Sequence, residues 1–414
     1  KKIIIGISGS IAAVKAPLLV SRLVKQEANV QCVITPSASN LVSPISLATL
    51  SRKICHQDID QWDPKQPRPL HIALAEWADL IVVTPMSATT LGKWANGIAD
   101  GLLSSLLLAF EGPVIAAAAM NTGMWKNSAV QKNWVNLQKD SKVLALAPSK
   151  GLLACDRLGE GKMVEPELIE LAIQSSFYQK QKNGELKKDL INQRLISTAG
   201  PTEEYLDPAR LLTNKSSGKM GVLIAQAAKL RGAHVDLIHG SIHTPSAWLE
   251  GLQTHEIKTA EDMRNTLKKL QPTSTAIAMA AAISDIRKIN GCSKEKLNKQ
   301  IFLESFQDSL EEVPDLLEEI CRERTSKQVI LGFAALTGNK EELLKKGHLK
   351  IRKKGCHLLM ANPIDIPHQG FGANYNGGYL IGPKGMVKEI PLMSKLALAH
   401  LLLDTILEIS QNNS

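Results

Sequence analysis

The sequence predicts an α/β protein built from two Rossmann-like domains, each with helices packed on both faces of a mainly parallel sheet. Continuous apolar segments alternate with helical patterns in both halves of the chain, which is typical of doubly wound three-layer folds. A chain of 414 residues is also too long for one ordinary hydrophobic core. We therefore expect domains at residues 1–175 and 194–414, joined by a polar linker at 176–193.

The first half contains five expected strands. Residues 2–8 form a continuous apolar run of the kind that is buried on both faces of a sheet. Further strands are expected at 30–35, 80–84, 114–119 and 143–147, with helices from Gly9 to about Glu27 and around 73–78. Ligands of such sheets bind beyond the carboxyl ends of the strands. The residues that follow these strands therefore predict a cofactor site, and they are Gly9, Ser10, Thr35, Ser37, Thr84, Ser87, Met120 and Asn121.

The second half repeats the alternation. Strands are expected at 195–198, 234–238, 275–281, 328–333 and 357–361, and helices at 217–231, 340–354 and 394–409. The segment 286–304 is polar and rich in lysine without clear periodicity, so we expect a loop there.

The composition favours small anionic ligands. The net charge is +9, but aromatic residues make up only 4% and no basic run is interleaved with them, so nucleic acid is not the expected partner. None of the six cysteines forms a Cys-x-x-Cys pair, which favours a reduced, cytoplasmic chain without a zinc site. No signal peptide or membrane-spanning apolar run is predicted.

The stretch 197–221 has the composition of a phosphate cradle at a strand-to-helix turn. Gly218 has no side chain to collide with an oxyanion, and Lys219 adds positive charge. The spacing of a Walker loop is absent. An ordinary helix start with Ser216 or Ser217 as N-cap explains the spacing equally well.

Two residues with catalytic chemistry carry little signal by themselves. His71, at an expected helix start, is more often a surface or packing residue in this position. A lone cysteine such as Cys155 is more often a small buried hydrophobe.

The motifs of the first half, taken together, resemble those of the flavin-dependent cysteine decarboxylases. Residues 9–15 resemble the flavin turn that opens these proteins, and 84–91 resemble their second flavin loop, with Thr89 where Asn is usual. Residues 118–125 resemble the Pro-x-Met-Asn-x-x-Met-Trp signature, with Ala118 in place of the proline. Residues 151–163 resemble the flap that covers the substrate.

The resemblance implies that this half binds FMN and decarboxylates 4′-phosphopantothenoylcysteine. Together with the strand ends, it gives as FMN-binding residues Gly9, Ser10, Ile11, Thr35, Ser37, Thr84, Ser87 and Thr89. It implies catalytic roles for His71, Asn121 and Cys155, with proton transfer by His71 and Cys155 as the proton donor. Asn121 and Met124 are the implied substrate contacts.

Residues 199–221 of the second half contain, in this order, Ala-Gly-Pro-Thr, Asp-Pro-x-Arg and Asn-x-Ser-Ser-Gly-Lys-Met-Gly. This pattern resembles the signature of the phosphopantothenate–cysteine ligases. With both halves considered, the whole chain is similar to the bacterial family of bifunctional phosphopantothenoylcysteine decarboxylase/phosphopantothenate–cysteine ligases. The chain departs from the family pattern at Asn298, Leu336 and Asn374, where Lys, Glu and Asp are usual.

The ligase resemblance also implies residue roles. Asn214 holds the activated carboxyl group, Arg210 acts in the cysteine step, and Ala281 and Ala282 contact substrate. The implied CTP contacts at the phosphates are Ser216, Gly218 and Gly221, together with Lys350 and Lys354, which are one helical turn apart. Those beside the base are Pro314, Asp315, Leu316 and Leu317, with Phe333 stacked on it. The other implied CTP contacts are Asp285 and Lys296, and Lys296 is also an implied catalytic residue.

The implied activity has two consecutive steps. CTP-dependent ligation joins 4′-phosphopantothenate to L-cysteine through an acyl-cytidylate, and FMN-dependent decarboxylation then gives 4′-phosphopantetheine. Mg²⁺ is the second implied cofactor, although no residue pattern identifies its ligands. CTP rather than ATP is implied by the family alone. The resemblance also implies a homo-oligomer with trimers of decarboxylase halves and dimers of ligase halves, which is consistent with a dodecamer.

Two alternatives were weighed against the bifunctional enzyme. One is a flavin-binding regulatory protein with a vestigial ligase half, but a regulator need not keep His71, Asn121 and Cys155 together. The other is a nicotinamide dehydrogenase, which is disfavoured because no G-x-G-x-x-G motif follows the first strand of either half.

Overall fold

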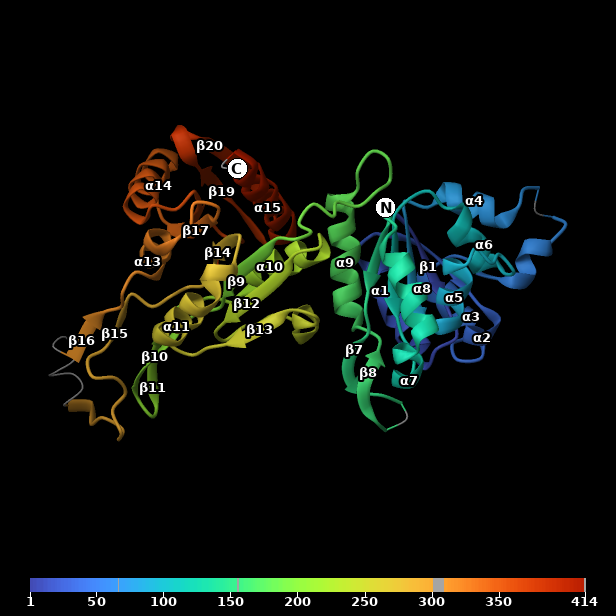
Figure 1. Ribbon diagram of the computed structural model, residues 1–414, viewed down its shortest axis with the longest axis horizontal. Coiled ribbons are helices and arrows are strands. Elements are labelled where there is room, and N and C mark those ends of the chain that lie inside the picture. The colour runs from blue at the N-terminus through green and yellow to red at the C-terminus, as the bar shows by residue number, and fades with distance from the viewer. Residues whose placement is uncertain (66, 155, 301–308, 413–414) are drawn as a thin grey trace. The chain divides into compact units, whose positions relative to one another are not determined.

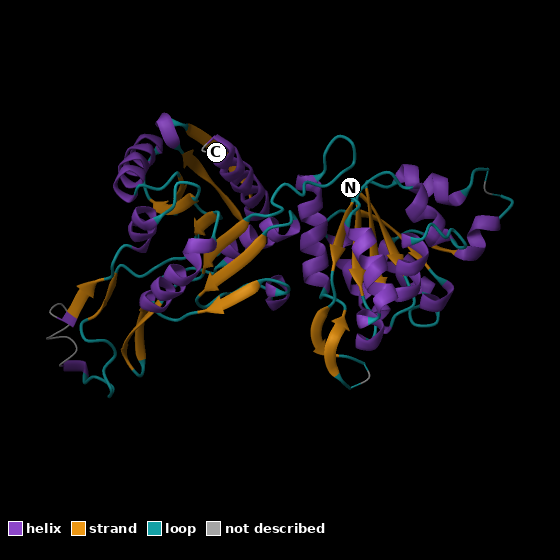
Figure 2. Ribbon diagram, in the orientation of Figure 1, coloured by secondary structure: helices purple, strands orange, loops and turns teal. Residues whose placement is uncertain are grey.

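A computed structural model describes residues 1–65, 67–154, 156–300 and 309–412. The chain forms two compact units, unit 1 at Lys1–Lys188 and unit 2 at Asp189–Ser414 (Figure 1). In each unit, helices cover both faces of a central sheet (Figure 2), which confirms the predicted α/β fold with two three-layer Rossmann-like units. The finer bounds 1–175, 176–193 and 194–414 stay a prediction.

Unit 1 has one parallel six-stranded sheet with the order β3-β2-β1-β4-β5-β6. Its strands are β1 (Lys2–Ile7), β2 (Asn29–Ile34), β3 (Cys55–Gln57), β4 (Leu80–Met86), β5 (Val114–Ala118) and β6 (Val143–Leu146). The order reverses between β1 and β4, which is the switch point of a doubly wound sheet, where ligands bind. Five of the six residues of β1 are buried, as its continuous apolar run predicted, and all seven residues of β4 are buried as well.

The helices of unit 1 form two layers. One consists of α1 (Ala16–Lys25), α3 (Pro44–Ser51) and α9 (Pro166–Gln179), and the other of α4 (Leu70–Trp77), α5 (Ala88–Ala95), α6 (Leu102–Ala109) and α8 (Ser128–Gln138). Two short helices, α2 (Pro36–Ser39) and α7 (Thr122–Lys126), follow β2 and β5, and β7 (Ser149–Leu152) pairs with β8 (Leu158–Lys162) as a hairpin.

Unit 2 has an eight-stranded sheet with the order β13-β12-β9-β14-β17-β18-β19-β20. Its strands are β9 (Arg194–Ala199), β12 (His234–His239), β13 (Gln253–Glu256), β14 (Ala276–Met279), β17 (Val329–Leu336), β18 (Leu358–Pro363), β19 (Tyr375–Ile381) and β20 (Val387–Ser394). The last two strands pair antiparallel, unlike the rest. The predicted parallel alternation is therefore correct up to β18.

Helices α10 (Lys219–Leu230) and α15 (Lys395–Asn412) pack together on one face of this sheet, and α11 (Ala260–Leu270), α13 (Leu316–Glu323) and α14 (Lys340–Lys354) lie on the other. Two antiparallel pairs stand outside the sheet: β10 (Glu203–Asp207) with β11 (Arg210–Thr213), and β15 (Ile286–Lys288) with β16 (Leu310–Glu312).

The structure corrects two local expectations. Helix α10 begins after Gly218, in a left-handed conformation with φ of 71°, and neither Ser216 nor Ser217 is its N-cap. The segment 286–304, expected as a loop, begins with β15, because β16 provides a backbone partner that the sequence pattern did not reveal; residues 301–304 lie outside the described residues. In the part of the chain that the structure describes, no helix is long and apolar enough to cross a membrane.

Candidate active sites

The first candidate site is a cavity of about 500 Å³ in unit 1. Its walls come from the segments that follow β1, β4 and β5 and from the β7–β8 hairpin, so it lies at the carboxyl edge of the sheet, as predicted. The residues that line it are Gly9, Ser10, Ile11, Ala12, Val14, Lys15, Ser87, Ala88, Thr89, Ala119, Met120, Asn121, Met124, Leu152, Leu153, Ala154, Gly161, Lys162 and Met163.

Close contacts fix the strand-end loops of this cavity. The Ser8 hydroxyl donates to the Pro85 carbonyl at 2.8 Å and accepts from the Ser87 amide at 2.8 Å, which ties the loop after β1 to the loop after β4. At Gly9 an added Cβ would lie 2.5 Å from the Ser37 Cβ, so the loops after β1 and β2 touch where a larger residue does not fit.

The β7–β8 hairpin packs directly on the loop after β5. The Met120 amide donates to the Gly161 carbonyl at 3.1 Å. Gly161 has φ of 140°, and an added Cβ would lie 2.1 Å from the Met120 carbonyl oxygen. Only glycine allows this approach. The hairpin therefore forms one wall of the cavity through a contact that depends on Gly161.

Two lysines at the cavity share one carboxylate. The ammonium groups of Lys15 and Lys162 lie 2.7 and 2.8 Å from Glu165 oxygens. Partial burial acts to raise the pKa of Glu165, but the hydrogen bonds from both lysines hold that pKa below its ordinary value. Because two positive charges face one negative charge, the edge keeps a net positive charge that suits an anionic ligand.

The cavity fits a flavin nucleotide in size and lining. Its volume lies within the range of about 300–1,000 Å³ that is usual for cofactor pockets. Ile11, Met120 and Met163 present apolar surface for a ring system. Ser10 lines the cavity and makes no capping hydrogen bond, so its hydroxyl is available to a polar group of the ligand.

The structure brings together most of the residues predicted for this site. Those that line the cavity are Gly9, Ser10, Ile11, Ser87, Thr89, Asn121 and Met124. Those that do not line it are Thr35, Ser37, Thr84 and His71, although Ser37 touches Gly9 and the buried Thr84 hydroxyl lies 3.3 Å from the Met163 sulfur. Cys155 lies outside the described residues.

The second candidate site is a cavity of about 470 Å³ in unit 2. Its walls include the start of α10, the segments after β14 and β18, the carboxyl half of β17, and parts of α13 and α14. The predicted residues that line it are Asn214, Ser216, Gly218, Ala281, Ala282, Asp285, Pro314, Asp315, Leu316, Leu317, Phe333, Lys350 and Lys354.

The turn before α10 allows a close approach of backbone segments. Gly218 has φ of 71°, and an added Cβ would lie 2.3 Å from an Ile242 methyl group and 3.1 Å from the Gly200 nitrogen. The Ser216 hydroxyl accepts from the Gly218 amide at 3.3 Å. The N-cap of α10 is Gly218 rather than Ser216 or Ser217, and the phosphate-cradle interpretation of this turn stays a prediction.

Asn214 is held against the segment that follows β14. Its amide group donates to the Ala282 and Ile283 carbonyls at 3.3 and 3.0 Å. The Ala282 amide in turn donates to the Gly200 carbonyl at 2.9 Å. Asn214 therefore lies beside Ala282 at the rim, with its orientation fixed by two backbone acceptors.

Charged side chains of both signs line the far wall. Lys354 forms an ion pair with Asp315, whose other oxygen accepts from the Glu318 amide at 3.1 Å and caps α13. Burial lowers the pKa of Lys354, although the charge of Asp285 acts in the opposite direction. Lys350, one turn earlier on α14, is exposed and lines the same cavity.

Three predicted residues do not line this cavity: Arg210, Gly221 and Lys296. Arg210 donates to the Leu297 carbonyl at 3.0 Å and so holds the segment that carries Lys296. Gly221 packs against β9, where an added Cβ would lie 2.2 Å from the Thr198 carbonyl oxygen. In this structure Gly221 therefore serves helix-to-strand packing.

No role was predicted from the sequence for several residues that line the cavity, among them Lys395, Asn376 and Asn362. The Asn362 side-chain oxygen is buried without a hydrogen-bond partner among the described residues, which makes it an acceptor for a ligand. Lys395 stands in an apolar helical pattern, and only its interruption of that pattern could have drawn attention to it. Leu336, where Glu is usual in the resembling family, is buried in the core.

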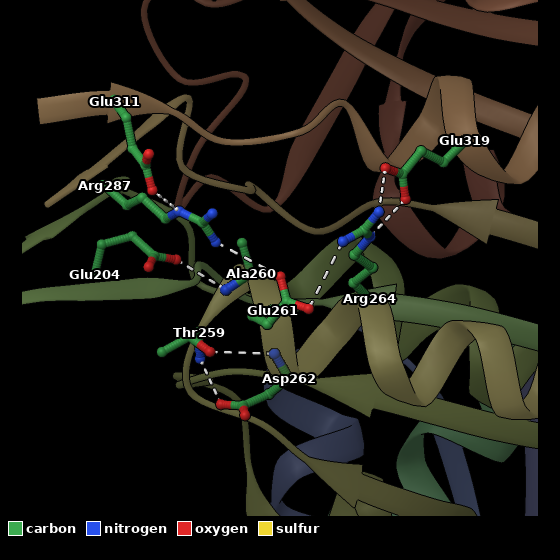
Figure 3. Close-up of polar contacts among 9 residues, drawn as sticks. All are labelled: Glu204, Thr259, Ala260, Glu261, Asp262, Arg264, Arg287, Glu311 and Glu319. Atoms are coloured by element: carbon green, nitrogen blue, oxygen red, sulfur yellow. Dashed lines mark hydrogen bonds and ion pairs between the residues drawn. The ribbon is translucent and has the colours of Figure 1, made fainter. Parts of the chain in front are cut away.

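A network of polar contacts links α11 to the β15–β16 pair and to α13 (Figure 3). Arg287 on β15 pairs with Glu311 on β16 at 2.8 Å and with Glu261 on α11 at 3.5 Å. Arg264 on α11 holds Glu319 on α13 through two hydrogen bonds of 2.7 and 2.8 Å. These contacts tie the β15–β16 pair and α13 to α11, and so position Asp285 and the 314–317 segment that lie next to them.

Two Rossmann-like units, each with a cavity at the carboxyl edge of its sheet, have the architecture of a two-domain α/β enzyme. The family model described as Flavoprotein matches residues 1–177, and the model described as DNA/pantothenate metabolism flavoprotein C-terminal domain matches residues 190–409.

Full-length relatives agree with both domain matches. Coenzyme A biosynthesis bifunctional protein CoaBC from Bacillus subtilis is 36% identical over 414 residues, which cover 99% of this chain and 98% of the relative. The protein of the same name from Vibrio cholerae is 33% identical and covers 99% of this chain and 98% of the relative. A crystal structure of the C-terminal domain of such a protein is 28% identical, with a TM-score of 0.43, over 54% of this chain and 98% of that chain.

The chain therefore belongs to the family of bifunctional coenzyme A biosynthesis enzymes, which combine a flavoprotein decarboxylase domain with a ligase domain.

Proposed function

We propose that unit 2 joins 4′-phosphopantothenate to L-cysteine with CTP, and that unit 1 decarboxylates the resulting 4′-phosphopantothenoylcysteine to 4′-phosphopantetheine, in the cytoplasm. The single observation that carries this proposal is the cavity of unit 2. It gathers thirteen of the residues implied by the ligase motifs, from segments scattered between Asn214 and Lys354. Unit 1 gathers its own motif residues around the other cavity.

In the ligation step, the substrate carboxylate attacks the α-phosphate of CTP, pyrophosphate leaves, and the cysteine amine then displaces CMP from the acyl-cytidylate. Asn214 is proposed to hold the activated carboxyl group, and one of its N–H groups then has to leave its backbone acceptor to do so. Lys350 and Lys354 stabilise negative charge on the phosphates. Phe333 offers its ring to the base, and the amide of Asn362 is a candidate for reading the base edge as cytosine.

Mg²⁺ is proposed to enter with the nucleotide. Among the described residues, no group of three histidine, cysteine, aspartate or glutamate side chains is placed to hold a metal ion. Mg²⁺ commonly binds substrate phosphates with water and one or two carboxylates. Asp285, which lines the cavity, is the proposed protein carboxylate.

In the decarboxylation step, bound FMN supplies two-electron redox chemistry. Gly9, Ser10 and Ser87 are proposed to hold it at the edge where the loops after β1 and β4 meet. Asn121 is proposed to hold the substrate, because it lines the cavity on the short segment between β5 and α7. Cys155 is proposed to donate the proton when the decarboxylated enethiolate is converted to 4′-phosphopantetheine.

A homo-oligomer would complete the first site. His71 does not line the cavity of its own unit, since α4 packs beside α6. Nearby apolar side chains such as Ile59 and Trp62 are 73% and 79% exposed, which suits burial against another copy. We therefore propose that unit 1 forms trimers in which His71 reaches a neighbour's cavity, and that unit 2 forms dimers, giving a dodecamer.

Product analysis of the purified chain tests the function. With 4′-phosphopantothenate, cysteine and MgCTP, the yellow protein should form CMP, pyrophosphate, CO₂ and 4′-phosphopantetheine. Cys155→Ser should form CMP and pyrophosphate at the normal rate and should not complete decarboxylation. A colourless protein that turns over neither substrate would instead favour a regulatory protein, and full product from Cys155→Ser would remove the proton-donor role.

A further inference from the structure

Lys395 places a buried ammonium group in the wall of the unit 2 cavity. It is the first residue of α15 and lines the cavity, yet it is only 5% exposed. Its ammonium donates to the Gly370 carbonyl at 2.8 Å. The backbone segment that accepts this bond, 370–372, also lines the cavity. Lys395 is therefore fixed at the wall and does not extend into open solvent.

This ammonium has no carboxylate partner in the described ranges of the chain. Among the residues that the structure describes, none with a carboxylate lies within 4.0 Å of the Lys395 nitrogen. Its charged neighbour is a second cation, Lys219, which also lines the cavity and lies 5.4 Å from the centre of the Trp248 ring. Burial, with the charge of Lys219 as a second cause, lowers the pKa of Lys395 to about 8.

Asn374 lies between the two lysines. Its side-chain oxygen accepts a hydrogen bond from Lys219, and its backbone carbonyl accepts from the Lys395 amide at 3.0 Å. Aspartate is usual at this position in the resembling family, so this chain has a neutral amide where a carboxylate would balance the lysines. In the part of the chain that the structure describes, neither of the two cations at this end of the cavity has a carboxylate partner.

A buried charge without a counterion is costly and is normally paired. We propose that Lys395 and Lys219 form a subsite that binds a phosphate dianion. The subsite rests on the proposed ligase function, which brings phosphate groups to this cavity from two sources. One is the phosphate monoester of 4′-phosphopantothenate, and the other is the terminal phosphate of CTP.

Calorimetric titration of the full-length protein separates the two sources. Binding of 4′-phosphopantothenate is compared with binding of pantothenate, and binding of MgCTP with binding of MgCDP. Lys395→Met keeps the volume of the side chain and removes its charge. Asn374→Asp keeps both lysines and adds the missing carboxylate. Lys384→Met, at an exposed lysine that does not line this cavity, is the matched control.

The subsite predicts that Lys395→Met and Asn374→Asp each weaken one phosphate-bearing ligand by about 10- to 100-fold, as expected for lost charge-assisted hydrogen bonds. The affinity of these two variants for the matching ligand without that phosphate should stay within about two-fold of the wild-type affinity. The affinity of the Lys384→Met protein should stay within the same range for all four ligands. The ligand pair that loses its difference identifies the source of the phosphate.

The proposal is overturned if both folded variants bind all four ligands as the wild type does. If Lys395→Met does not fold, the proposal is tested by Asn374→Asp and by the pH dependence of binding to the wild-type protein. Wild-type affinity for the phosphate-bearing ligand should fall as pH rises through about 8, because Lys395 loses its proton there. Pyrophosphate release by the wild-type protein, together with wild-type affinity of both variants for all four ligands, would contradict the subsite but not the ligase function. A wild-type protein that binds neither substrate nor nucleotide contradicts the ligase function, and the subsite with it.

Discussion

Replacing Lys395 by methionine should stabilise unit 2 in the absence of ligand, and by an amount that depends on pH. The pKa of Lys395 is about 8 in the folded protein against an ordinary value of 10.5. Each pKa unit corresponds to about 1.4 kcal/mol, so the folded state bears a cost of about 3 kcal/mol when this side chain is protonated. Loss of the hydrogen bond to Gly370 offsets about 1 kcal/mol of the gain. A net increase of about 2 kcal/mol in the free energy of unfolding is expected near pH 7.

The sign of the pH dependence follows from which state holds the proton. Below pH 8 the folded and unfolded chains are both protonated, and the full cost is present. Between pH 8 and 10.5 the folded chain has lost the proton that the unfolded chain keeps, so wild-type stability rises with pH and the advantage of the variant shrinks. Other charged groups that line the cavity, namely Lys219, Lys350, Lys354, Asp285 and Asp315, are common to both proteins, so the difference isolates Lys395.

Urea unfolding of the full chain at pH 7 and pH 10 measures this difference. Hydrogen exchange of peptides from β9 and β14, followed by mass spectrometry, reports unit 2 separately from unit 1. The variant should be more stable than the wild type at pH 7, and that advantage should fall by about 2 kcal/mol at pH 10. A difference that does not change with pH, or a variant that is less stable at pH 7, would refute the assignment of a buried, uncompensated charge to Lys395.

Two further substitutions test the cavity walls separately. Gly161→Ala places a Cβ 2.1 Å from the Met120 carbonyl oxygen at φ of 140°, which should displace the β7–β8 hairpin and weaken flavin retention by about 10-fold. Flavin absorbance per chain after gel filtration measures this loss. Unchanged absorbance would contradict the role of the hairpin as a wall of the cavity. Arg287→Ala removes the ion pairs to Glu311 and Glu261, which are partly exposed and contribute at most about 1 kcal/mol. The KM for CTP should therefore rise by up to about five-fold. Decarboxylation of supplied 4′-phosphopantothenoylcysteine should stay unchanged. A loss confined to decarboxylation would contradict the positioning role of Arg287.

The parallel core of each unit was predictable because its strands are buried on both faces. The runs that became β1, β4 and β17 are apolar over most of their length, so a simple pattern finds them. The edge strands β3 and β13 are short and polar, and their backbone pairing leaves no apolar signal. The antiparallel strand β20 was missed for a related reason, since it is mostly exposed. Strand β19 is mostly buried, but Gly377 and Gly378 interrupt its pattern.

A missed helix shows that a local signal was present and unused. Helix α11 begins with a capping box in which Thr259 and Asp262 exchange hydrogen bonds at 2.9 and 3.1 Å (Figure 3). A threonine followed three residues later by an acidic residue is a recognised helix start. The helix end is equally conventional, with Lys268 and Lys269 in its last turn.

The candidate sites were predictable where they follow strands and unpredictable where they depend on packing. Ser87 and Asn121 are found because they come directly after β4 and close after β5. Lys395 begins a helix whose other residues are mainly apolar, and its burial against Gly370 follows only from the path of a distant loop. His71 shows the opposite limit, because a motif names the residue but its own unit does not bring it to the cavity.

The most direct test of two sequential activities in one chain is a matched count of products from one reaction. With MgCTP, 4′-phosphopantothenate and carboxyl-labelled cysteine, the wild-type chain should release pyrophosphate and labelled CO₂ in equal amounts. Asn214→Ala should release neither from these substrates, yet should still release CO₂ from supplied 4′-phosphopantothenoylcysteine. Absence of both products from the wild type, or loss of CO₂ release from the supplied intermediate in Asn214→Ala, would contradict two separate sites joined by a shared intermediate.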